Sequence, residues 1–172
     1  MKILEVPIQP SDIDSLSVGE SVVIKGDILA GRDAVLPRLC ELIRRDEVEK
    51  LGITLEGGVV FHTAVSPAGI GPTSSNKVEI EGSFETLSQA GIRIHLGKGA
   101  ISPDTVNMLA REHSCFAVIP PVTALLKDRT LDQRVAGFPE LGMEALHVLE
   151  SQGYPAIIAA VNGKSVFGET GE

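Results

Sequence analysis

The dipeptide Asn162-Gly163 lies between two segments rich in apolar residues near the end of the chain, residues 155–161 (PAIIAAV) and 164–167 (KSVF). Asn-Gly is preferred in two-residue type I′ turns, because both residues of such a turn take a positive φ. The pattern therefore predicts an antiparallel β-hairpin. Upstream, strand-like segments alternate with segments of helical periodicity, which is typical of a parallel sheet covered by helices. Together the two patterns predict an α/β fold with a mixed sheet.

Several upstream segments have the composition of strands, and they are residues 19–29, 57–65, 92–96 and 115–122. Apolar residues at helical spacing predict helices at residues 34–51, 83–90, 104–113 and 139–151. Ser102 and Pro103 supply an N-cap and a first-turn proline for the helix that follows them. Residues 1–17 contain Pro7 and Pro10 and are expected to form an extended lead-in to a single domain that covers residues 1–172.

The formal net charge of −8 and the 3% of aromatic residues argue against binding to nucleic acid, which requires basic surface and stacking side chains. No apolar run is long enough to cross a membrane, and the N-terminus lacks the layout of a secretory signal, so we expect a cytoplasmic protein. Cys40 and Cys115 lie in apolar stretches without a second cysteine at metal-ligand spacing. Buried, reduced thiols are the expectation for both.

Three loops with positive charge each follow a predicted strand: Gly31-Arg32-Asp33, residues 71–77 (GPTSSNK) and Gly97-Lys98-Gly99. Arginine offers a planar fork to a carboxylate, lysine offers a point charge, and glycine lets a ligand approach the backbone. Together the loops could form one anion site. Taken singly, each has a simpler explanation, because Arg32 could pair with a neighbouring aspartate, Thr73 could cap a turn and Lys98 could be solvated.

The sequence contains none of the common nucleotide-binding or zinc-binding motifs. The GKG turn lacks the spacing and the hydroxyl residue of a P-loop, and GIGPTS lacks the spacing of a dinucleotide fingerprint. His62 and His95 fall in predicted strands, whereas His113 and His147 fall in predicted helices, and none has zinc-site spacing. A structural role is the interpretation we favour for all of these histidines.

Taken in order, several phrases resemble the C-terminal region, or β subunit, of class I (Fe–S) fumarate hydratases and L-tartrate dehydratases: VGESVVIKGDILAGRDAVLPRL, GIGPTSSNK, LGKGAISPDTV, FPELGMEAL and YPAIIAAVNGKSVF. The resemblance extends from Val18 to Phe167. It implies a swivelling β/β/α domain. It also implies that Arg32 and Lys98 hold substrate carboxylates, that Thr73 is a catalytic residue beside the reacting carbons, and that Lys77 replaces a substrate-binding arginine.

The resemblance further implies that a [4Fe-4S] cluster is held by a separate α subunit and that this chain contributes no metal ligand. The expected function is the β subunit of a hydro-lyase, active only with its α partner, which hydrates fumarate to L-malate or dehydrates a related diacid such as tartrate. Self-association into a homo-oligomer is compatible with this function. Leu36, where the family commonly has histidine, and Lys77 support the alternative, a non-catalytic binding or assembly module with the same fold. A phosphate carrier domain would need an exposed phosphorylatable histidine, which His113 fits poorly.

Overall fold

The computed structural model describes residues 1–66, 69–73, 81–119 and 123–167. In these ranges nine strands form one mixed sheet with the order β1-β2-β3-β5-β6-β8-β7, as predicted for an α/β domain, and β4 and β9 pair with β3 and β8. The strands are β1 (Lys2–Glu5), β2 (Ser21–Gly31), β3 (Val59–Ser66), β4 (Gly69–Thr73), β5 (Ile94–Gly97), β6 (Cys115–Val118), β7 (Thr130–Gly137), β8 (Leu146–Val161) and β9 (Lys164–Ser165).

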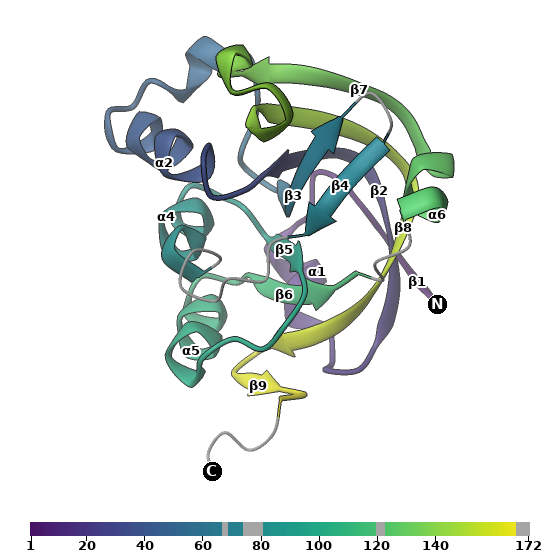
Figure 1. Ribbon diagram of the computed structural model, residues 1–172. Helices are drawn as coiled ribbons and strands as arrows, with labels where there is room; N and C mark the ends of the chain where they lie inside the picture. Colours follow the sequence, from purple (N-terminus) through teal and green to yellow (C-terminus); the bar gives the residue numbers. More distant parts are fainter. Residues whose placement is uncertain (67–68, 74–80, 120–122, 168–172) are drawn as a thin grey trace.

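The central strands close into a barrel. Strands β2, β3, β5 and β6 are parallel neighbours. The long strand β8 runs antiparallel to β6 at one end of this row and also pairs antiparallel with β2 at the other end. The sheet therefore curls back on itself (Figure 1). Because the four central strands are parallel, their carboxyl ends meet at one edge of the barrel.

The interior of the barrel is built from alternate residues of these strands, as the two-residue period of a strand requires. The register aligns Ala30, Phe61, Leu96 and Ala117 in one layer across the four parallel strands. All four are fully buried and belong to the same apolar cluster, together with Tyr154 of β8. Phe61 and Tyr154 meet edge to face, with ring centroids 6.3 Å apart. This layer is the floor beneath the carboxyl edge of the barrel.

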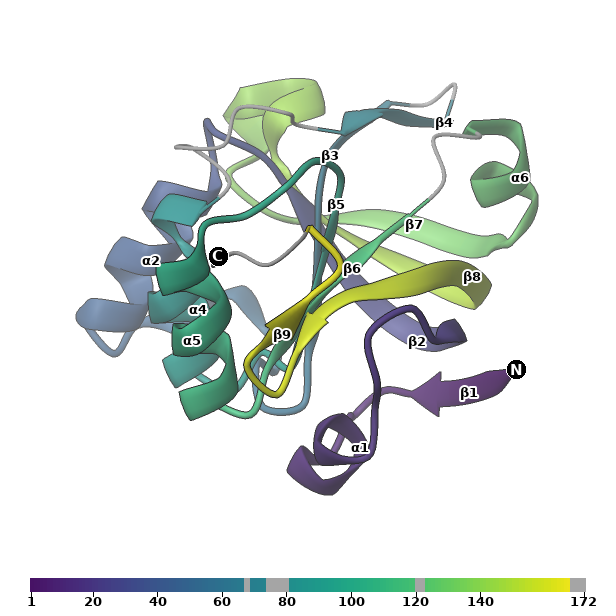
Figure 2. The same cartoon turned by 90° about the horizontal axis from the view of Figure 1, so that it is seen from below.

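Helices α2 (Leu36–Arg44), α4 (Phe84–Gln89) and α5 (Pro103–Arg111) stand side by side on one flank of the barrel (Figures 1 and 2). Leu39 of α2 and Leu109 of α5 are fully buried in the two apolar clusters outside the barrel. The remaining helical segments are α1 (Pro10–Asp14), α6 (Thr123–Asp128) and the 3-10 turns η1 (Val48–Leu51) and η2 (Pro139–Glu144). None of the helices in the described ranges has the length and apolar composition needed to span a bilayer.

The start of α5 follows its prediction. The Ser102 hydroxyl accepts a hydrogen bond from the Thr105 amide at 3.3 Å, so Ser102 is the N-cap and Pro103 the first helical residue. Glu81 adds a second cap: its carboxylate accepts hydrogen bonds from the Ser102 amide at 3.2 Å and from the Ser102 hydroxyl at 2.8 Å. The Thr105 hydroxyl also donates to Glu81. A carboxylate at this position is stabilised by the N-terminal end of the helix dipole.

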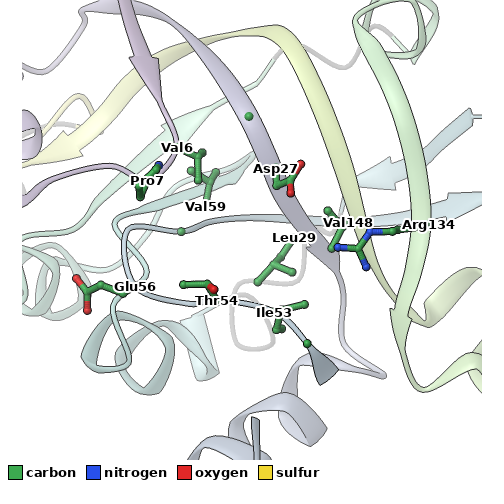
Figure 3. Close-up of a pocket in the computed structure, with 13 residues that line it drawn as sticks. Val6, Pro7, Asp27, Leu29, Ile53, Thr54, Glu56, Val59, Arg134 and Val148 are labelled. Carbon is green, nitrogen blue, oxygen red and sulfur yellow. The ribbon is translucent and has the colours of Figure 1, made fainter. Parts of the chain in front are cut away.

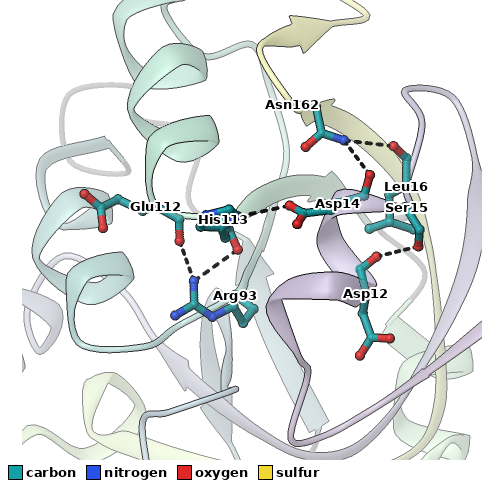
Figure 4. A network of polar contacts seen from close by, with 8 residues as sticks. All are labelled: Asp12, Asp14, Ser15, Leu16, Arg93, Glu112, His113 and Asn162. Carbon is teal, nitrogen blue, oxygen red and sulfur yellow. Dashed lines mark hydrogen bonds and ion pairs between the residues drawn. The ribbon is translucent and has the colours of Figure 1, made fainter.

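The predicted hairpin is present. Asn162 and Gly163 have φ values of 53° and 83°, and Val161 pairs with Lys164 across the turn. The Asn162 side chain donates to the carbonyl oxygens of Asp14 and Leu16, each at 3.2 Å. His113, just after α5, pairs with the Asp14 carboxylate at 3.0 Å (Figure 4). This network fastens the hairpin and the end of α5 to the N-terminal segment.

Residues 139–151 do not form the predicted amphipathic helix, and His147 lies in a strand instead. Gly142 has a φ of 60° and a ψ of −121°, which breaks the helical path inside the short 3-10 segment η2. The following residues, Leu146 to Leu149, are all buried because this part of β8 lies between β2 and β7. A strand buried on both faces has a continuous apolar pattern, which is easily read as helical.

Three other segments also differ from expectation. Within the predicted lead-in, residues 2–5 form β1, parallel to β2, and α1 begins at Pro10. Proline suits the first helical position because the missing N–H has no helical partner there. The helix predicted for residues 34–51 ends at Arg44, since Asp46 takes a φ of 56°. Residues 69–73, predicted as loop, form β4, and the patterns did not indicate α6 or β7.

Candidate carboxylate-binding site

Arg32 and Lys98 lie at the same edge of the barrel. Strands β2 and β5 end at Gly31 and Gly97, so each cation is the first residue beyond a strand end. Both strands flank β3, where Gly31 pairs with His62 and Leu96 pairs with Phe61. Arg32 therefore lies one register step beyond the Gly31–His62 pair, and Lys98 lies two steps beyond the Leu96–Phe61 pair, each just past the end of a strand that flanks β3. Two strand spacings separate their backbones, about 10 Å, a gap that two long side chains and a diacid can fill.

Thr73 is brought to this same edge by β4. The strand turns back antiparallel along β3, and its last residue, Thr73, pairs with Thr63. The backbone of Thr73 therefore lies beside Thr63, the residue of β3 that follows His62, the partner of Gly31. Thr63 itself is fully buried and was not singled out from the sequence, because nothing in its local pattern distinguishes it. Lys77, the fourth predicted site residue, lies outside the described residues.

The Arg32 guanidinium is held by Glu144, a residue that the sequence analysis missed. The distance from Nη2 to Oε2 is 2.6 Å and that from Nε to Oε1 is 3.4 Å. Both side chains are partly buried, with 27% and 29% exposure, so solvent weakens the pair less than it would a surface ion pair. Glu144 lies 112 positions from Arg32 in the sequence. Only the phrase FPELGME, quoted for its resemblance, pointed to this segment.

The segment that carries Glu144 is itself fixed to α2. Arg38 forms an ion pair with Glu140 at 3.0 Å, and its guanidinium lies 5.8 Å from the centre of the Phe138 ring. Phe138 takes a φ of 54°, an uncommon value that directs the chain into η2. Two arginines near one end of α2 thus contact the same short segment: Arg38 through an exposed ion pair, which contributes little, and Arg32 through a partly buried one, which fixes its side chain.

Glycines shape the two cationic loops for steric reasons. A Cβ atom on Gly31 would lie 2.7 Å from Cγ1 of Val35, so only glycine lets α2 begin so close to β2. Gly99 has a φ of 87°, in the left-handed region that favours glycine. Lys98 between Gly97 and Gly99 is partly buried rather than fully solvated. In the described part of the chain no hydrogen bond or ion pair is seen for its ammonium group.

Two of the buried histidines, His62 and His95, lie outside the barrel against α4. His62 and His95 are in strands, as predicted, and the Phe84 ring stacks on His95 with centroids 4.2 Å apart. Ser88 Oγ lies 2.9 Å from Nε2 of His95. Burial lowers the pKa of His62 to about 3, and burial followed by the neighbouring His62 lowers that of His95. Both rings are therefore neutral near pH 7 and have the surroundings of structural residues.

The thiols of the chain do not fit an iron–sulfur cluster. Cys40 and Cys115 are buried in separate apolar clusters, as predicted. Burial raises the pKa of Cys115 to about 12 and also raises the pKa of Cys40, which opposes the thiolate form that iron requires. Among the residues that the structure describes, no group of three or more His, Cys, Asp or Glu side chains could hold a metal ion.

A cavity of about 550 Å³ lies elsewhere, on the outer wall of the barrel (Figure 3). Its apolar lining includes Leu29 and Val148, and its charged residues are Asp27, Glu56 and Arg134. Asp27 of β2 precedes Arg32 by five residues in the sequence, which corresponds to about 16 Å of extended chain. The cavity is thus separate from the edge that carries Arg32 and Lys98.

The chain is similar in sequence to a known protein family and to several named relatives. Residues 2–170 match the family described as Fumarase C-terminus. The L(+)-tartrate dehydratase subunit beta of Escherichia coli (strain K12) is 26% identical, and the match covers 94% of this chain and 83% of the relative. Fumarate hydratase 2 of Leishmania major is 27% identical over 89% of this chain but only 28% of its own length. The anaerobic class I fumarate hydratase of Escherichia coli (strain K12) is similar in both respects, at 27% identity and 28% of its length. Because the family match spans nearly the whole chain, this protein belongs to the Fumarase C-terminus family.

Proposed function

We propose that this chain is the β subunit of an iron–sulfur hydro-lyase that hydrates fumarate to L-malate or dehydrates a related hydroxy diacid such as tartrate. The observation that carries the proposal is the placement of Arg32 and Lys98 at one barrel edge, each just beyond the end of a strand that flanks β3. Relatives named as a tartrate dehydratase β subunit and as fumarate hydratases support the reaction class. The chain's own role is to bind and orient the diacid.

The chemistry explains why cations are needed at this edge. Adding water across a double bond conjugated to a carboxylate builds negative charge on that carboxylate in the transition state. A fixed guanidinium and a fixed ammonium stabilise this charge without having to reorganise during the reaction. Arg32, with its fork aligned by Glu144, would bind one carboxylate in a defined orientation, and Lys98 would neutralise the other.

Thr73 is the residue that we propose lies beside the reacting carbons. The pairing of Thr73 with Thr63 brings its backbone to the barrel edge that carries both cations, which supports this placement. A threonine hydroxyl is a weak acid and a weak base, so a proton transfer at its Oγ requires a polarising group nearby. We propose that the partner subunit supplies that group and that Lys77 adds a further positive charge to the site.

The cluster of this enzyme would be held by an α subunit. The buried thiols here do not suit cluster ligation, and the name "subunit beta" of the tartrate dehydratase relative refers to an assembly of more than one chain. When bound, a [4Fe-4S] cluster with one open iron supplies Lewis-acid activation of substrate or water. We therefore propose that catalysis requires both subunits and that the substrate lies between them.

A non-catalytic binding module is the second candidate, and one observation favours it. Leu36 occupies the position where the family commonly has histidine, and its side chain is 3% exposed within an apolar cluster. This position therefore contributes no polar group to the site. A binding module would still hold a dicarboxylate through Arg32 and Lys98 but would not convert it.

The test is to co-express this chain with a candidate α subunit, reconstitute the cluster without oxygen and follow the absorbance of fumarate. We expect activity only with both chains, and a loss of about 100-fold or more in kcat/KM for Arg32→Ala and for Lys98→Ala. Arg45→Ala and Lys50→Ala, whose side chains are 63% and 69% exposed on the helical flank, are the matched controls and should retain full activity. A cluster-loaded complex that binds diacids without converting them would support the binding module instead.

A further inference from the structure

Strand β7 has one open edge. In the described part of the chain it pairs only with β8, at the end of the strand order. Residues 131–135 of β7 are all exposed, and Figure 1 draws the strand along the rim of the molecule. Such an edge presents unpaired backbone groups to another strand, and proteins commonly protect it unless it is used. The question is which strand it fits.

The sequence of β7 is complementary to itself. In an antiparallel pair of two β7 strands with the two-fold axis at Gln133, Asp132 of one copy faces Arg134 of the other, and Leu131 faces Val135. Residues directly opposite in such a pair have Cβ atoms about 4.5–5.5 Å apart, so opposite charges attract and apolar side chains cover each other. Leu131 and Val135 are 60% and 49% exposed in the single chain. Pairing would remove both from water.

A row of carboxylates next to this edge provides a second reason for the pairing. Glu150 of β8 is the register partner of Asp132 on one side and of Asp27 on the other. All three are exposed, and like charges directly opposite in a sheet destabilise it. The structure shows no ion pair for these three within the described residues. Arg134 of a second copy, directly opposite Asp132, would place a cation at the outer end of this acidic row.

We propose that this chain forms a two-fold dimer through antiparallel pairing of β7 with β7 of a second copy, registered at Gln133. Irregularities in the β7–β8 register lie between Thr130 and Asp132 and between Val135 and Gly137. They limit the regular segment to residues 132–135 and leave Leu131 at an irregular end of the strand, so the register of the short pairing is set by the Asp132–Arg134 contacts and the Leu131–Val135 contact is secondary. By symmetry each of these contacts occurs twice, as in any isologous interface.

The experiment is sedimentation equilibrium of the full chain, with charge-reversal variants. The wild type should dimerise, whereas Asp132→Arg and Arg134→Asp alone should each raise the dissociation constant by about tenfold or more, because like charges then face each other twice. An equimolar mixture of the two variants should restore wild-type affinity, since every facing pair is then opposite in charge. Arg45→Asp on the helical flank is the control and should leave the dimer unchanged.

Because each variant is tested both alone and in the mixture, a folding defect is distinguished from a lost contact. The proposal is overturned by a wild-type chain that stays monomeric at about 100 µM, by single variants that dimerise as the wild type does, or by a mixture that fails to restore association. Loss of α-subunit binding in the single variants that the mixture does not restore would assign the β7 edge to that partner and also overturn the dimer.

Discussion

The Glu144 carboxylate of η2 accepts hydrogen bonds from the Arg32 guanidinium, from Nη2 at 2.6 Å and from Nε at 3.4 Å, and so joins η2 to the end of β2. Glu144 therefore orients the Arg32 guanidinium although Glu144 itself need not contact the substrate. If Arg32 binds a substrate carboxylate, the contact determines how well the site is prepared before binding.

Glu144→Gln should therefore weaken substrate binding without removing a substrate contact. The neutral amide holds the guanidinium less firmly, so we expect KM for the diacid to rise and kcat/KM to fall by about tenfold, equivalent to about 1.4 kcal/mol. Steady-state kinetics of the assembled enzyme measure this. Glu140→Gln in the same segment, whose partner Arg38 is 49% exposed, is the control and should change kcat/KM little. Equal losses of kcat/KM in both variants would show that the position of η2, rather than the Glu144–Arg32 contact, determines substrate binding.

Mild acid should destabilise the fold through the buried histidines. Burial lowers the pKa of His62 to about 3 and that of His95 below its usual range, whereas both return to about 6.5 when unfolded. Stability is thus full above pH about 6.5 and is lost as the pH falls, by up to about 1.4 kcal/mol per pH unit for each histidine. Urea unfolding between neutral pH and about pH 5 measures the slope.

His62→Phe keeps a ring beside Phe84 but cannot bind a proton. The slope of unfolding free energy against pH should therefore fall by up to about 1.4 kcal/mol per pH unit, the contribution of one proton. Phe84→Leu, which disturbs the same cluster of rings without removing a titratable group, is the control and should lower stability without changing the slope. A slope that His62→Phe leaves unchanged would show that His62 is not kept neutral in the folded protein.

Both thiols should resist alkylation in the folded chain. Burial raises the pKa of Cys115 to about 12 and that of Cys40 above its usual value, and the thiolate is the reactive form. With iodoacetamide at mildly alkaline pH, we expect labelling about 100-fold slower in the native chain than in urea, as read by intact mass. Fast native labelling of either cysteine would contradict the burial and would reopen the question of a metal site in this chain.

Glu81 should stabilise the start of α5. In Glu81→Gln an amide replaces a carboxylate that accepts hydrogen bonds from the Ser102 amide and from two hydroxyls, so the unfolding free energy should fall by about 1–3 kcal/mol. Ser102→Ala should cost about 1 kcal/mol as a lost N-cap. Thermal unfolding compares both with Glu85→Gln, an exposed change in α4. If Glu81→Gln and Glu85→Gln have the same melting temperature, Glu81 does not stabilise the start of α5.

Local patterns predicted the elements whose own sequence decides their structure. The Asn162-Gly163 turn requires positive φ at both positions, and Ser102-Pro103 forms a cap from adjacent residues, so both were confirmed. Residues 139–151 were wrongly assigned because Gly142 and the neighbours of β8 decide their conformation. The closure of the sheet, which depends on β8 pairing with β2, has no local signal in the sequence.

In the candidate site, too, local features could be predicted from the sequence and contacts between distant residues could not. Arg32 and Lys98 could be proposed from the sequence because cations next to glycine after strands, and the resemblance to known phrases, are local features. Their common edge follows from the parallel register, which the structure adds. Glu144 was missed because no spacing rule links residues 112 positions apart. The roles of Arg32, Lys98, Thr73 and Lys77 in the reaction all stay predictions.

The most direct test of the central claim is an anaerobic crystal structure of this chain assembled with its α subunit and a bound dicarboxylate. The account predicts carboxylate oxygens within about 3 Å of the Arg32 guanidinium and of the Lys98 ammonium, at the carboxyl edge of the barrel. A dicarboxylate bound away from both residues, for example in the cavity beside Asp27 and Arg134, would contradict it.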